Sequence, residues 1–213
     1  MTLRVMIADD HAVMREGLKA LLEGTSDLRV AGMASNGREA IRLAAELKPD
    51  VLIMDIAMPE LNGIEAARLL REKCPGVRVV ILSMHSDAEY VHRALDAGAA
   101  GYLLKEFAGA EIAAAVRTVS EGRRYLSPEI AERGSTRAPG SGGAGPLERL
   151  SARERQVLQL VAEGKSSAEI AAIVHLSPKS VETYRSRLMK KLGVTGVAAL
   201  VKFALQHGLT PPT

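Results

Sequence analysis

Cysteine, tryptophan and aromatic residues in general are scarce in this chain of 213 residues. Its single cysteine, Cys74, has no partner for a disulfide within the chain, so we expect a buried or half-buried thiol. Tryptophan is absent and aromatic residues make up 3% of the sequence, which argues against stacking platforms for single-stranded nucleic acid. No apolar run approaches the roughly 18 residues of a membrane span, and the first residues lack the pattern of a signal peptide. These absences favour a cytoplasmic protein without a membrane partner.

Positive charge is concentrated in the last third of the chain. Residues 147–213 contain 10 Lys and Arg against 5 Asp and Glu, whereas residues 1–125 contain 16 against 18. Between these regions, residues 134–146 are rich in Gly, Ser and Pro, a composition typical of a flexible linker. We therefore predict a domain at 1–125, a linker at 126–146 and a basic domain at 147–213.

The first domain alternates between short apolar runs and segments with helical spacing. Five runs are typical of strands buried on both faces, at 3–8, 28–34, 51–54, 77–82 and 100–104. Helices are predicted at 12–23, 37–47, 61–73, 87–97 and 109–121. Asn36 with Glu39 and Ser86 with Glu89 fit capping boxes for two of them. This alternation predicts an α/β fold with a five-stranded, doubly wound parallel sheet, as in flavodoxin.

Polar residues stand where these apolar runs end. Asp9 and Asp10 follow the first run, Asp55 the third, Ser83 the fourth and Lys105 the fifth. Because ligands of such sheets bind beyond the carboxyl ends of the strands, we expect these side chains to form one pocket. Three carboxylates without a set of His or Cys ligands suit Mg²⁺, while the lysine and the serine supply donors for an anionic group. The grouping is typical of phosphoryl transfer to a carboxylate, with Asp55 as the nucleophile.

Each of these residues also has a simpler explanation. Asp9 and Asp10 could serve only as a helix cap, and Asp55 could be a turn residue. Ser83 could cap the chain after a strand, and Lys105 could be a solvated charge. The functional interpretation is favoured because all five positions fall on the same edge of the predicted sheet.

Residues 3–121 resemble the receiver domain of bacterial two-component response regulators. The residues that carry the resemblance are, in order, Asp9, Asp10, Asp55, Met58, Pro59, Gly63, Ser83, Tyr102 and Lys105. The resemblance implies that a histidine kinase donates a phosphoryl group to Asp55. It also implies that Asp10, Asp55 and the backbone carbonyl of Ala57 hold Mg²⁺, with Asp9 assisting through water.

Two further roles come from the same resemblance. Ser83 and Lys105 would bind the phosphoryl oxygens, and Tyr102 would swing inward when Ser83 moves. Position 83 is Ser where Thr is commoner in such domains, which keeps the hydroxyl. Tyr102 could instead be a packing residue whose hydroxyl faces water. His85 beside the pocket is interpreted as an exposed loop histidine.

Residues 147–213 show helical signals and no strand signal. Ser151 with Glu154 and Ser166 with Glu169 form capping boxes ahead of two helices, and Ser177-Pro178 opens a third that ends at Leu192. Only two residues separate the second helix from Ser177, which is typical of a helix-turn-helix. A fourth helix is predicted at 197–206.

The third helix of this domain has a polar face suited to the major groove of DNA. Residues predicted to lie on that face are Lys179, Glu182, Thr183, Ser186, Arg187 and Lys190. Contacts with phosphates are predicted for Lys165, Ser166, Lys179, Arg185 and Lys191. Glu182 could accept a hydrogen bond from cytosine or pair within the helix with Arg185 or Ser186. A merely solvated helix face is the simpler alternative.

Residues 150–209 also resemble the four-helix DNA-binding domain of the NarL/FixJ/LuxR group. The matching segments are 151–154, 166–171, 177–184 and 191–194. The third of these segments places Ser180 in the predicted DNA-binding set. In such domains the last helix forms a two-fold interface, and here it carries the apolar residues Val197, Leu200, Val201, Ala204 and Leu205. Some of these could instead complete the small core.

Together, these patterns predict a transcription factor that is controlled by phosphorylation, and not an enzyme. We expect it to bind double-stranded promoter DNA as a homodimer once a sensor histidine kinase has phosphorylated it. RNA polymerase is a further candidate partner. One alternative is a phosphorylation-independent regulator whose receiver docks a protein. Another is a metal-dependent phosphatase on a similar sheet.

Overall fold

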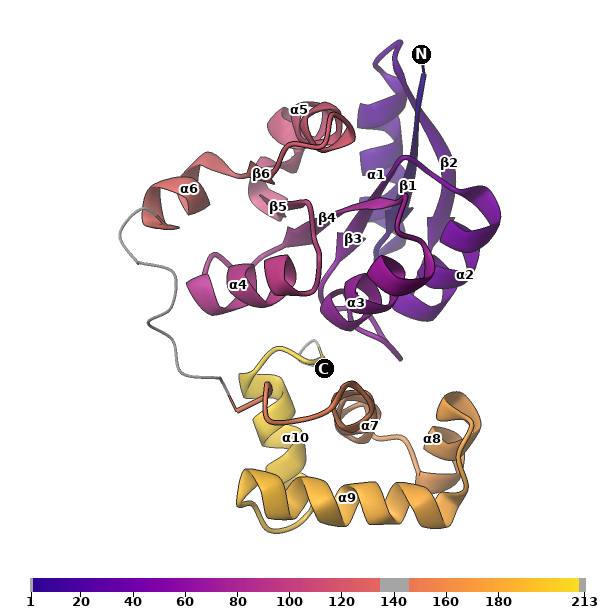
Figure 1. Ribbon diagram of the computed structural model, residues 1–213, viewed down its shortest axis with the longest axis vertical. Helices are drawn as coiled ribbons and strands as arrows, with labels where there is room; N and C mark the ends of the chain where they lie inside the picture. The colour runs from indigo at the N-terminus through magenta and orange to yellow at the C-terminus, as the bar shows by residue number, and fades with distance from the viewer. Residues whose placement is uncertain (1, 135–145, 211–213) are drawn as a thin grey trace. The chain divides into compact units, whose positions relative to one another are not determined.

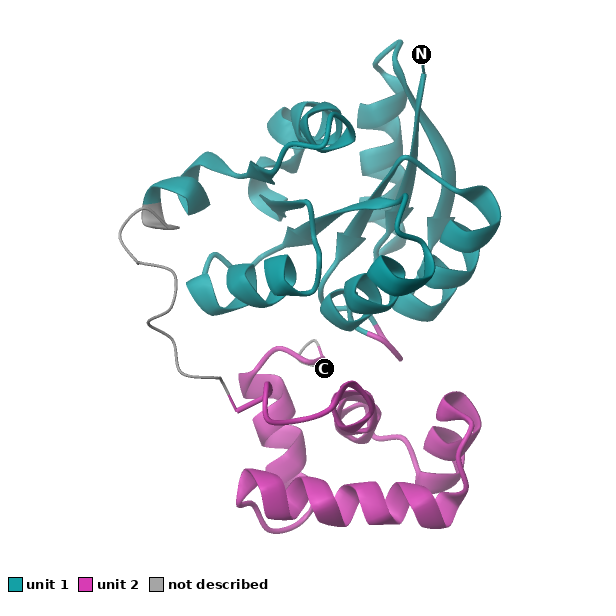
Figure 2. Ribbon diagram, in the orientation of Figure 1, with its two compact units in different colours: residues 1–58, 62–138 teal, residues 59–61, 139–213 magenta. Residues whose placement is uncertain are grey.

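The computed structural model describes residues 2–134 and 146–210. The chain divides into two compact units, residues 1–58 with 62–138 and residues 59–61 with 139–213 (Figure 2). The first unit contains a sheet and helices, and the second contains helices (Figure 1). Within the described residues, no helix combines the length and the apolar character needed to cross a bilayer.

All strands of the first unit run parallel in one sheet, with the order β2-β1-β3-β4-β5-β6 (Figure 1). They are β1 Leu3–Ala8, β2 Leu28–Ala34, β3 Val51–Asp55, β4 Arg78–Ser83, β5 Gly101–Leu104 and β6 Tyr125–Leu126. The predicted parallel α/β fold is confirmed, but the sheet has six strands where the sequence predicted five. The extra strand, β6, is two residues long and pairs with Gly101 and Tyr102. A run that short gives no apolar pattern to detect.

The helices of the first unit cover both faces of the sheet. They are α1 Ala12–Glu23, α2 Gly37–Leu47, α3 Gly63–Lys73, α4 Ala88–Asp96, the 3₁₀ helix η1 Lys105–Phe107, α5 Ala108–Ser120 and α6 Pro128–Gly134. α1 and α5 lie together on one face, and α2, α3 and α4 lie on the other (Figure 1). In β1, Val5 and Ile7 pack in the core with α1 and α5, while Met6 between them is also fully buried. Burial on both faces explains why the strands are continuously apolar.

Of the two capping boxes predicted in this unit, the one at Asn36 has the correct N-cap residue. The Asn36 side chain accepts a hydrogen bond from the Glu39 N–H at 2.9 Å, and the Glu39 carboxylate accepts from Ser35 instead of Asn36. The predicted box of Ser86 with Glu89 has the wrong N-cap residue. α4 begins after Asp87, so Glu89 is its second residue, one position too early for the box.

The predicted linker, residues 126–146, begins with structured residues. Its first ten residues include the end of β6 and the helix α6. Ser127, which precedes α6, is fully buried, and its N–H donates to the Tyr102 carbonyl at 3.0 Å. Its hydroxyl accepts from the Leu104 N–H at 3.2 Å and donates to the Glu111 carboxylate at 2.8 Å. These contacts attach the start of α6 to β5 and α5. The Gly- and Ser-rich part of the predicted linker lies outside the described residues.

The second unit contains four α-helices in its described part. They are α7 Ala152–Ala162, α8 Ser167–Val174, α9 Pro178–Leu192 and α10 Val197–Gln206. Both predicted capping boxes are present, at Ser151 with Glu154 and at Ser166 with Glu169. Leu158, Val181 and Leu200 are fully buried in a core shared by α7, α9 and α10. The short connection between α8 and α9 confirms the helix-turn-helix arrangement.

Candidate functional site

An acidic cluster occupies the carboxyl edge of the central strands. Asp9 and Asp10 follow β1, Asp55 is the last residue of β3 and Lys105 is the first residue after β5. The Lys105 Nζ lies 2.8 Å from Asp9 Oδ2 and 2.8 Å from Asp55 Oδ2. Asp9 is fully buried and Asp55 is 3% exposed. The structure therefore brings together Asp9, Asp10, Asp55 and Lys105, four of the five residues that the sequence placed at the strand ends.

Burial and the neighbouring charges shift the pKa values of both Asp55 and Lys105. Burial raises the pKa of Asp55, and the nearby Lys105 ammonium lowers it only in part. The negative charge of Asp9 adds to the increase. Burial acts to lower the pKa of Lys105, but the Asp55 and Asp9 carboxylates outweigh it and raise that pKa. The ionised form of Asp55 is thus destabilised by burial, and a further positive charge nearby would stabilise it.

The same cluster could hold a divalent cation. Ligand atoms of Asp9, Asp10, His11 and Asp55 lie within 4.8 Å of one another. Asp10 Oδ1 is buried and accepts no hydrogen bond from the described residues, although His11 Nδ1 is 2.7 Å away. A carboxylate oxygen left in this state is available as a metal ligand, and a set dominated by carboxylates fits Mg²⁺. Sequence reasoning did not include His11, and its position directly after the acidic pair was the only available signal.

Ala57 lies next to the cluster in the loop after β3. Its N–H donates a hydrogen bond to the Asp55 carboxylate. Gly63 closes the same loop, because its N–H donates to the Ile56 carbonyl at 2.9 Å. A Cβ at position 63 would lie 2.1 Å from the Asp55 carbonyl oxygen. Only glycine allows the start of α3 to approach β3 this closely, so Gly63 helps to fix the position of Asp55.

Ser83 and Tyr102 are connected through His85. The Ser83 hydroxyl accepts a hydrogen bond from the His85 N–H at 3.0 Å, and the Tyr102 hydroxyl donates to the His85 carbonyl at 2.7 Å. Tyr102 is fully buried, so its hydroxyl does not face water, and burial raises its pKa. The His85 ring stacks on Tyr90 with centroids 4.3 Å apart. His85 is exposed, as expected, but its backbone joins the two residues that the sequence assigned to the switch.

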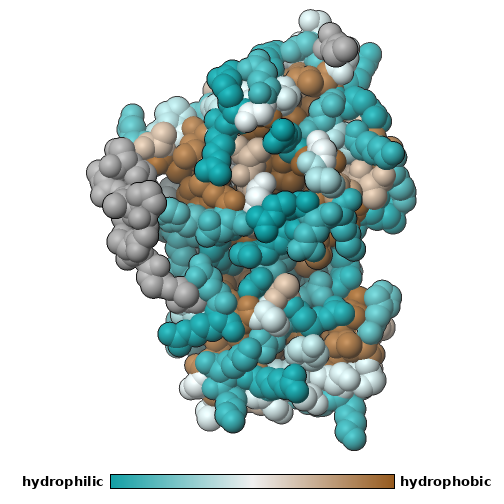
Figure 3. Space-filling model, in the orientation of Figure 1, coloured by the Kyte–Doolittle hydropathy of each residue, from teal (hydrophilic) through white to brown (hydrophobic). Residues whose placement is uncertain are grey.

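In the second unit, α9 presents the polar face that the sequence predicted. Val181 and Leu188 are buried against the core, and Tyr184 and Leu192 pack at its margin. The exposed residues of the predicted set are Ser166, Lys179, Glu182, Thr183, Ser186, Arg187, Lys190 and Lys191. Lys165, Ser180 and Arg185 are partly buried. The visible side of the region occupied by α9 is mostly hydrophilic or intermediate (Figure 3). One helix face thus gathers most of the predicted contacts.

Three charged members of that set, Glu182, Arg185 and Lys191, form ion pairs within the protein. Lys191 Nζ lies 2.8 Å from Glu154 Oε2, in the capping box of α7. Arg185 pairs with Glu182 at 3.2 Å. The pairing of Glu182 within the helix was one of the two alternatives that the sequence left open.

The last helix has apolar side chains on two sides. Leu200 and Ala204 are buried in the core of the second unit. Val197 is 46% exposed and Leu205 is 40% exposed, while Val201 is partly buried. The helix therefore completes the core with some of its apolar residues and keeps others at the surface.

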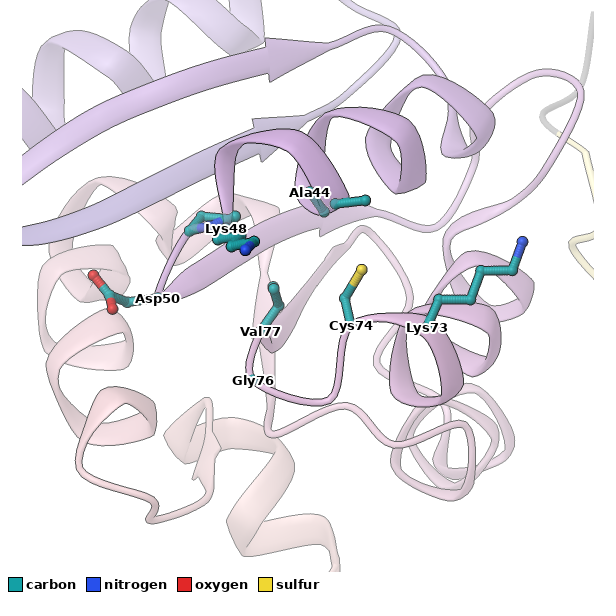
Figure 4. A pocket seen from close by; sticks show the side chains of 9 residues that line it. Ala44, Lys48, Asp50, Lys73, Cys74, Gly76 and Val77 are labelled. Carbon is teal, nitrogen blue, oxygen red and sulfur yellow. The ribbon is translucent and has the colours of Figure 1, made fainter.

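A separate cleft lies at the opposite, amino edge of the sheet (Figure 4). It has a volume of about 320 Å³ and is lined by residues around the starts of β3 and β4, including Lys48, Lys73 and Cys74. Cys74 is half-buried, which agrees with the sequence prediction for this thiol. The cleft shares no residue with the acidic cluster.

Comparisons with known proteins agree with this division of the chain. A family model described as the response regulator receiver domain matches residues 5–117, and one described as bacterial regulatory proteins of the luxR family matches residues 148–204. The transcriptional regulatory protein MctR of Rhizobium johnstonii is 39% identical over 209 residues, covering 97% of this chain and 95% of that protein.

Solved structures give the same result. A crystal structure of a LuxR-family two-component response regulator from Aurantimonas has a TM-score of 0.62 and 37% identity, covering 64% of this chain and 97% of that one. A complex of the response regulator RcsB with DNA has a TM-score of 0.59 and 26% identity, covering 95% and 98%.

The chain belongs to the response regulators of bacterial two-component systems in which a receiver domain is joined to a LuxR-family helix-turn-helix domain. It is a DNA-binding regulator of transcription.

Proposed function

We propose that Asp55 accepts a phosphoryl group from the phosphohistidine of a sensor kinase. The observation that carries this proposal is the 2.8 Å contact between the Lys105 ammonium and the Asp55 carboxylate in a buried pocket. An Asp55 oxygen attacks phosphorus, the bond from phosphorus to the histidine nitrogen breaks, and the imidazole keeps the electron pair. Lys105 and the Ser83 hydroxyl then donate to the phosphoryl oxygens, since both stand at the same edge of the sheet.

Mg²⁺ is the cofactor that the donor set fits best. Asp10, Asp55 and the carbonyl of Ala57 would hold it, with Asp9 assisting through water. When bound, the ion neutralises negative charge as the phosphoryl group arrives. Lys105 contributes to the same neutralisation, because it is already paired with both buried carboxylates.

Phosphorylation acts on Tyr102 through the loop after β4. The Ser83 hydroxyl now accepts from the His85 N–H, so a new bond to a phosphoryl oxygen would draw Ser83 and this loop toward Asp55. The Tyr102 hydroxyl donates a hydrogen bond to the His85 carbonyl. When the loop moves, Tyr102 would have to move with it or lose this hydrogen bond. Tyr102 is therefore the proposed switch residue.

The helix-turn-helix domain binds promoter DNA through the exposed face of α9. Lys179, Thr183, Ser186, Arg187 and Lys190 contact base edges and phosphates in the major groove. Lys165, Ser166, Ser180 and Lys191 add contacts to the backbone. The exposed Val197 and Leu205 of α10 form a two-fold interface in the phosphorylated state. The proposed partners are a sensor histidine kinase, double-stranded DNA, a second copy of the chain and RNA polymerase. The proposed location is the cytoplasm.

The domain boundaries follow from these roles. The receiver domain, predicted to end at 125, extends through α6 to residue 134, because Ser127 is buried against β5 and α5. The linker precedes a DNA-binding domain that starts at 147.

Incubation of the full-length protein with acetyl phosphate and Mg²⁺, followed by mass spectrometry, tests the proposal. One phosphoryl adduct is expected, located at Asp55 and absent from the Asp55→Asn variant. A protein that forms no adduct under conditions in which a known receiver does so would support a protein-docking receiver instead. Release of phosphate from unrelated esters would point to a phosphatase.

A further inference from the structure

Glu182 and Arg185 of α9 are held by neighbouring protein groups. Arg185 Nη1 lies 3.2 Å from Glu182 Oε1, and Arg185 Nη2 donates to the main-chain carbonyl of Lys165 at 3.1 Å. Ser167, the first residue of α8, donates a hydroxyl hydrogen bond to the same Glu182 oxygen. The Arg185 side chain is only 17% exposed, whereas that of Glu182 is 60% exposed. These contacts join α9 to the start of α8 and to the loop before it.

The two helices of the helix-turn-helix, α8 and α9, are consequently joined to each other at two places. The first is the turn between α8 and α9, where His175 adopts a left-handed conformation with φ of 54°. The second is the set of contacts of Glu182 and Arg185, near the other end of α8. A turn fixes one end of two helices but leaves their crossing angle adjustable. Hydrogen bonds at the far end restrict that angle because they weaken steeply when their geometry changes.

We propose that Ser167, Glu182 and Arg185 form a clamp that sets the angle of α9 and so the register of its exposed side chains on DNA. In this role Glu182 contacts no base and Arg185 contacts no phosphate, and both are positioning residues. The proposal rests on the proposed function of α9 as the DNA-contacting helix. The clamp also explains why the Glu182 carboxylate is tolerated on a helix face that contacts DNA phosphates, because the Arg185 guanidinium offsets its negative charge.

A change that leaves the charge unaltered gives the first test. The full-length phosphorylated protein is used to select binding sites from random DNA, and affinities are then measured for the selected site and for random DNA. Ser167→Ala removes one clamp bond and no charge. We expect the ratio of the two affinities to fall about tenfold, since a hydrogen bond to a charged group is lost. Affinity for random DNA and its salt dependence should stay unchanged.

A matched pair of arginine variants gives the second test. Arg185→Ala and Arg187→Ala each remove one positive charge from α9, but Arg187 is exposed on its outer face. Arg187→Ala should lower the slope of log affinity against log salt by about one. Arg185→Ala should leave that slope nearly unchanged and reduce the specificity ratio about tenfold. The double variant Ser167→Ala/Arg185→Ala should lose no more specificity than Arg185→Ala, because both changes break the same clamp.

Three results would overturn the clamp. They are an unchanged specificity ratio in Ser167→Ala, a loss of about one in the salt slope of Arg185→Ala, and additive losses in the double variant. Thermal unfolding of each variant shows whether it is folded. If Arg185→Ala does not fold, the Ser167→Ala result decides. Failure of the unaltered protein to enrich any DNA site would contradict sequence-specific binding by α9 itself, a different outcome from loss of the clamp.

Discussion

The ammonium nitrogen of Lys105 stands 2.8 Å from the carboxylate of Asp55, at the end of a strand where both side chains are largely buried. Burial nevertheless raises the pKa of Asp55, so the ionised carboxylate destabilises the folded receiver domain. Sites that carry out chemistry often retain such a cost in stability. Its effects on stability and on phosphorylation can be measured.

Asp55→Asn should abolish phosphorylation and make the receiver domain more stable at neutral pH. Asn has nearly the same volume and needs no counter-charge, so we expect a gain of about 1 kcal/mol, or roughly 3–6 °C in Tm. Between the ordinary pKa and the raised pKa, folded Asp55 binds more protons than unfolded Asp55, so stability of the unaltered protein falls as pH rises. The advantage of the variant should therefore grow with pH. Calorimetry from about pH 4 to about pH 8 measures it, and a gain independent of pH would rule out the buried Asp55 charge as its cause.

Lys105→Met should destabilise the receiver domain and make that loss sensitive to Mg²⁺. Removing the ammonium leaves the Asp9 and Asp55 carboxylates buried without their shared partner, a change that costs about 3 kcal/mol in comparable pairs. A bound divalent cation would restore part of the balance, so Mg²⁺ should raise the Tm of the variant more than that of the unaltered protein. Lys73→Met, at an exposed position, is the control. Equal shifts with Mg²⁺ in both variants would contradict this.

Gly63→Ala should cost far more than an ordinary glycine substitution. The added Cβ would meet the Asp55 carbonyl oxygen at 2.1 Å, so the chain around Asp55 must move. We expect a loss of about 2–4 kcal/mol in unfolding free energy, together with slower phosphorylation. Gly17→Ala is the matched control, because nothing lies within 4 Å of its Cβ in the exposed part of α1. It should stabilise the domain by about 0.5–1 kcal/mol. Similar effects of the two changes would show that the loop around Gly63 can relax.

Leu205→Ser should weaken dimerisation without unfolding the DNA-binding domain. The side chain is 40% exposed, so little apolar packing is lost within the domain. Sedimentation of the phosphorylated full-length protein is expected to show about tenfold weaker self-association, because burial of one leucine contributes about 1.5–3 kcal/mol. Leu21→Ser, at a leucine that is 45% exposed on α1, should leave self-association unchanged. A dimer that is unaffected by Leu205→Ser but weakened by Leu21→Ser would place the interface on the receiver domain.

Sequence patterns predicted the fold and the acidic cluster because both depend on short, regular rules. Carboxyl ends of parallel strands meet at one edge, so Asp9, Asp55 and Lys105 could be placed together without coordinates. The sequence did not predict that Lys105 would pair with both carboxylates, since that depends on side-chain conformation. The strand β6 was missed because two residues are too few to show a pattern of apolar residues. The start of α6 had a usable signal in Ser127-Pro128, since the same Ser-Pro pair at Ser177-Pro178 correctly predicted the start of α9.

In the second unit, too, the local contacts were predicted from the sequence and the contacts between distant residues were not. Capping boxes such as Ser151 with Glu154 are local and were predicted. The bond from Ser167 to Glu182 joins residues 15 positions apart and depends on how α8 crosses α9. Nothing in either local segment signals it. The polar helix face therefore gave Arg185 a phosphate contact and left Glu182 open between cytosine and Arg185, while the structure pairs the two residues with each other.

The pairing of β6 with Gly101 and Tyr102 affects how this protein can be dissected. A receiver fragment that stops at residue 124 would remove β6 and uncover backbone N–H and C=O groups along the edge of β5. Uncovered strand edges of this kind recruit strands from other molecules and lead to aggregation. It would also leave the Glu111 carboxylate without the Ser127 hydroxyl. An isolated receiver intended for crystallisation or for a phosphorylation sensor should therefore end after residue 134.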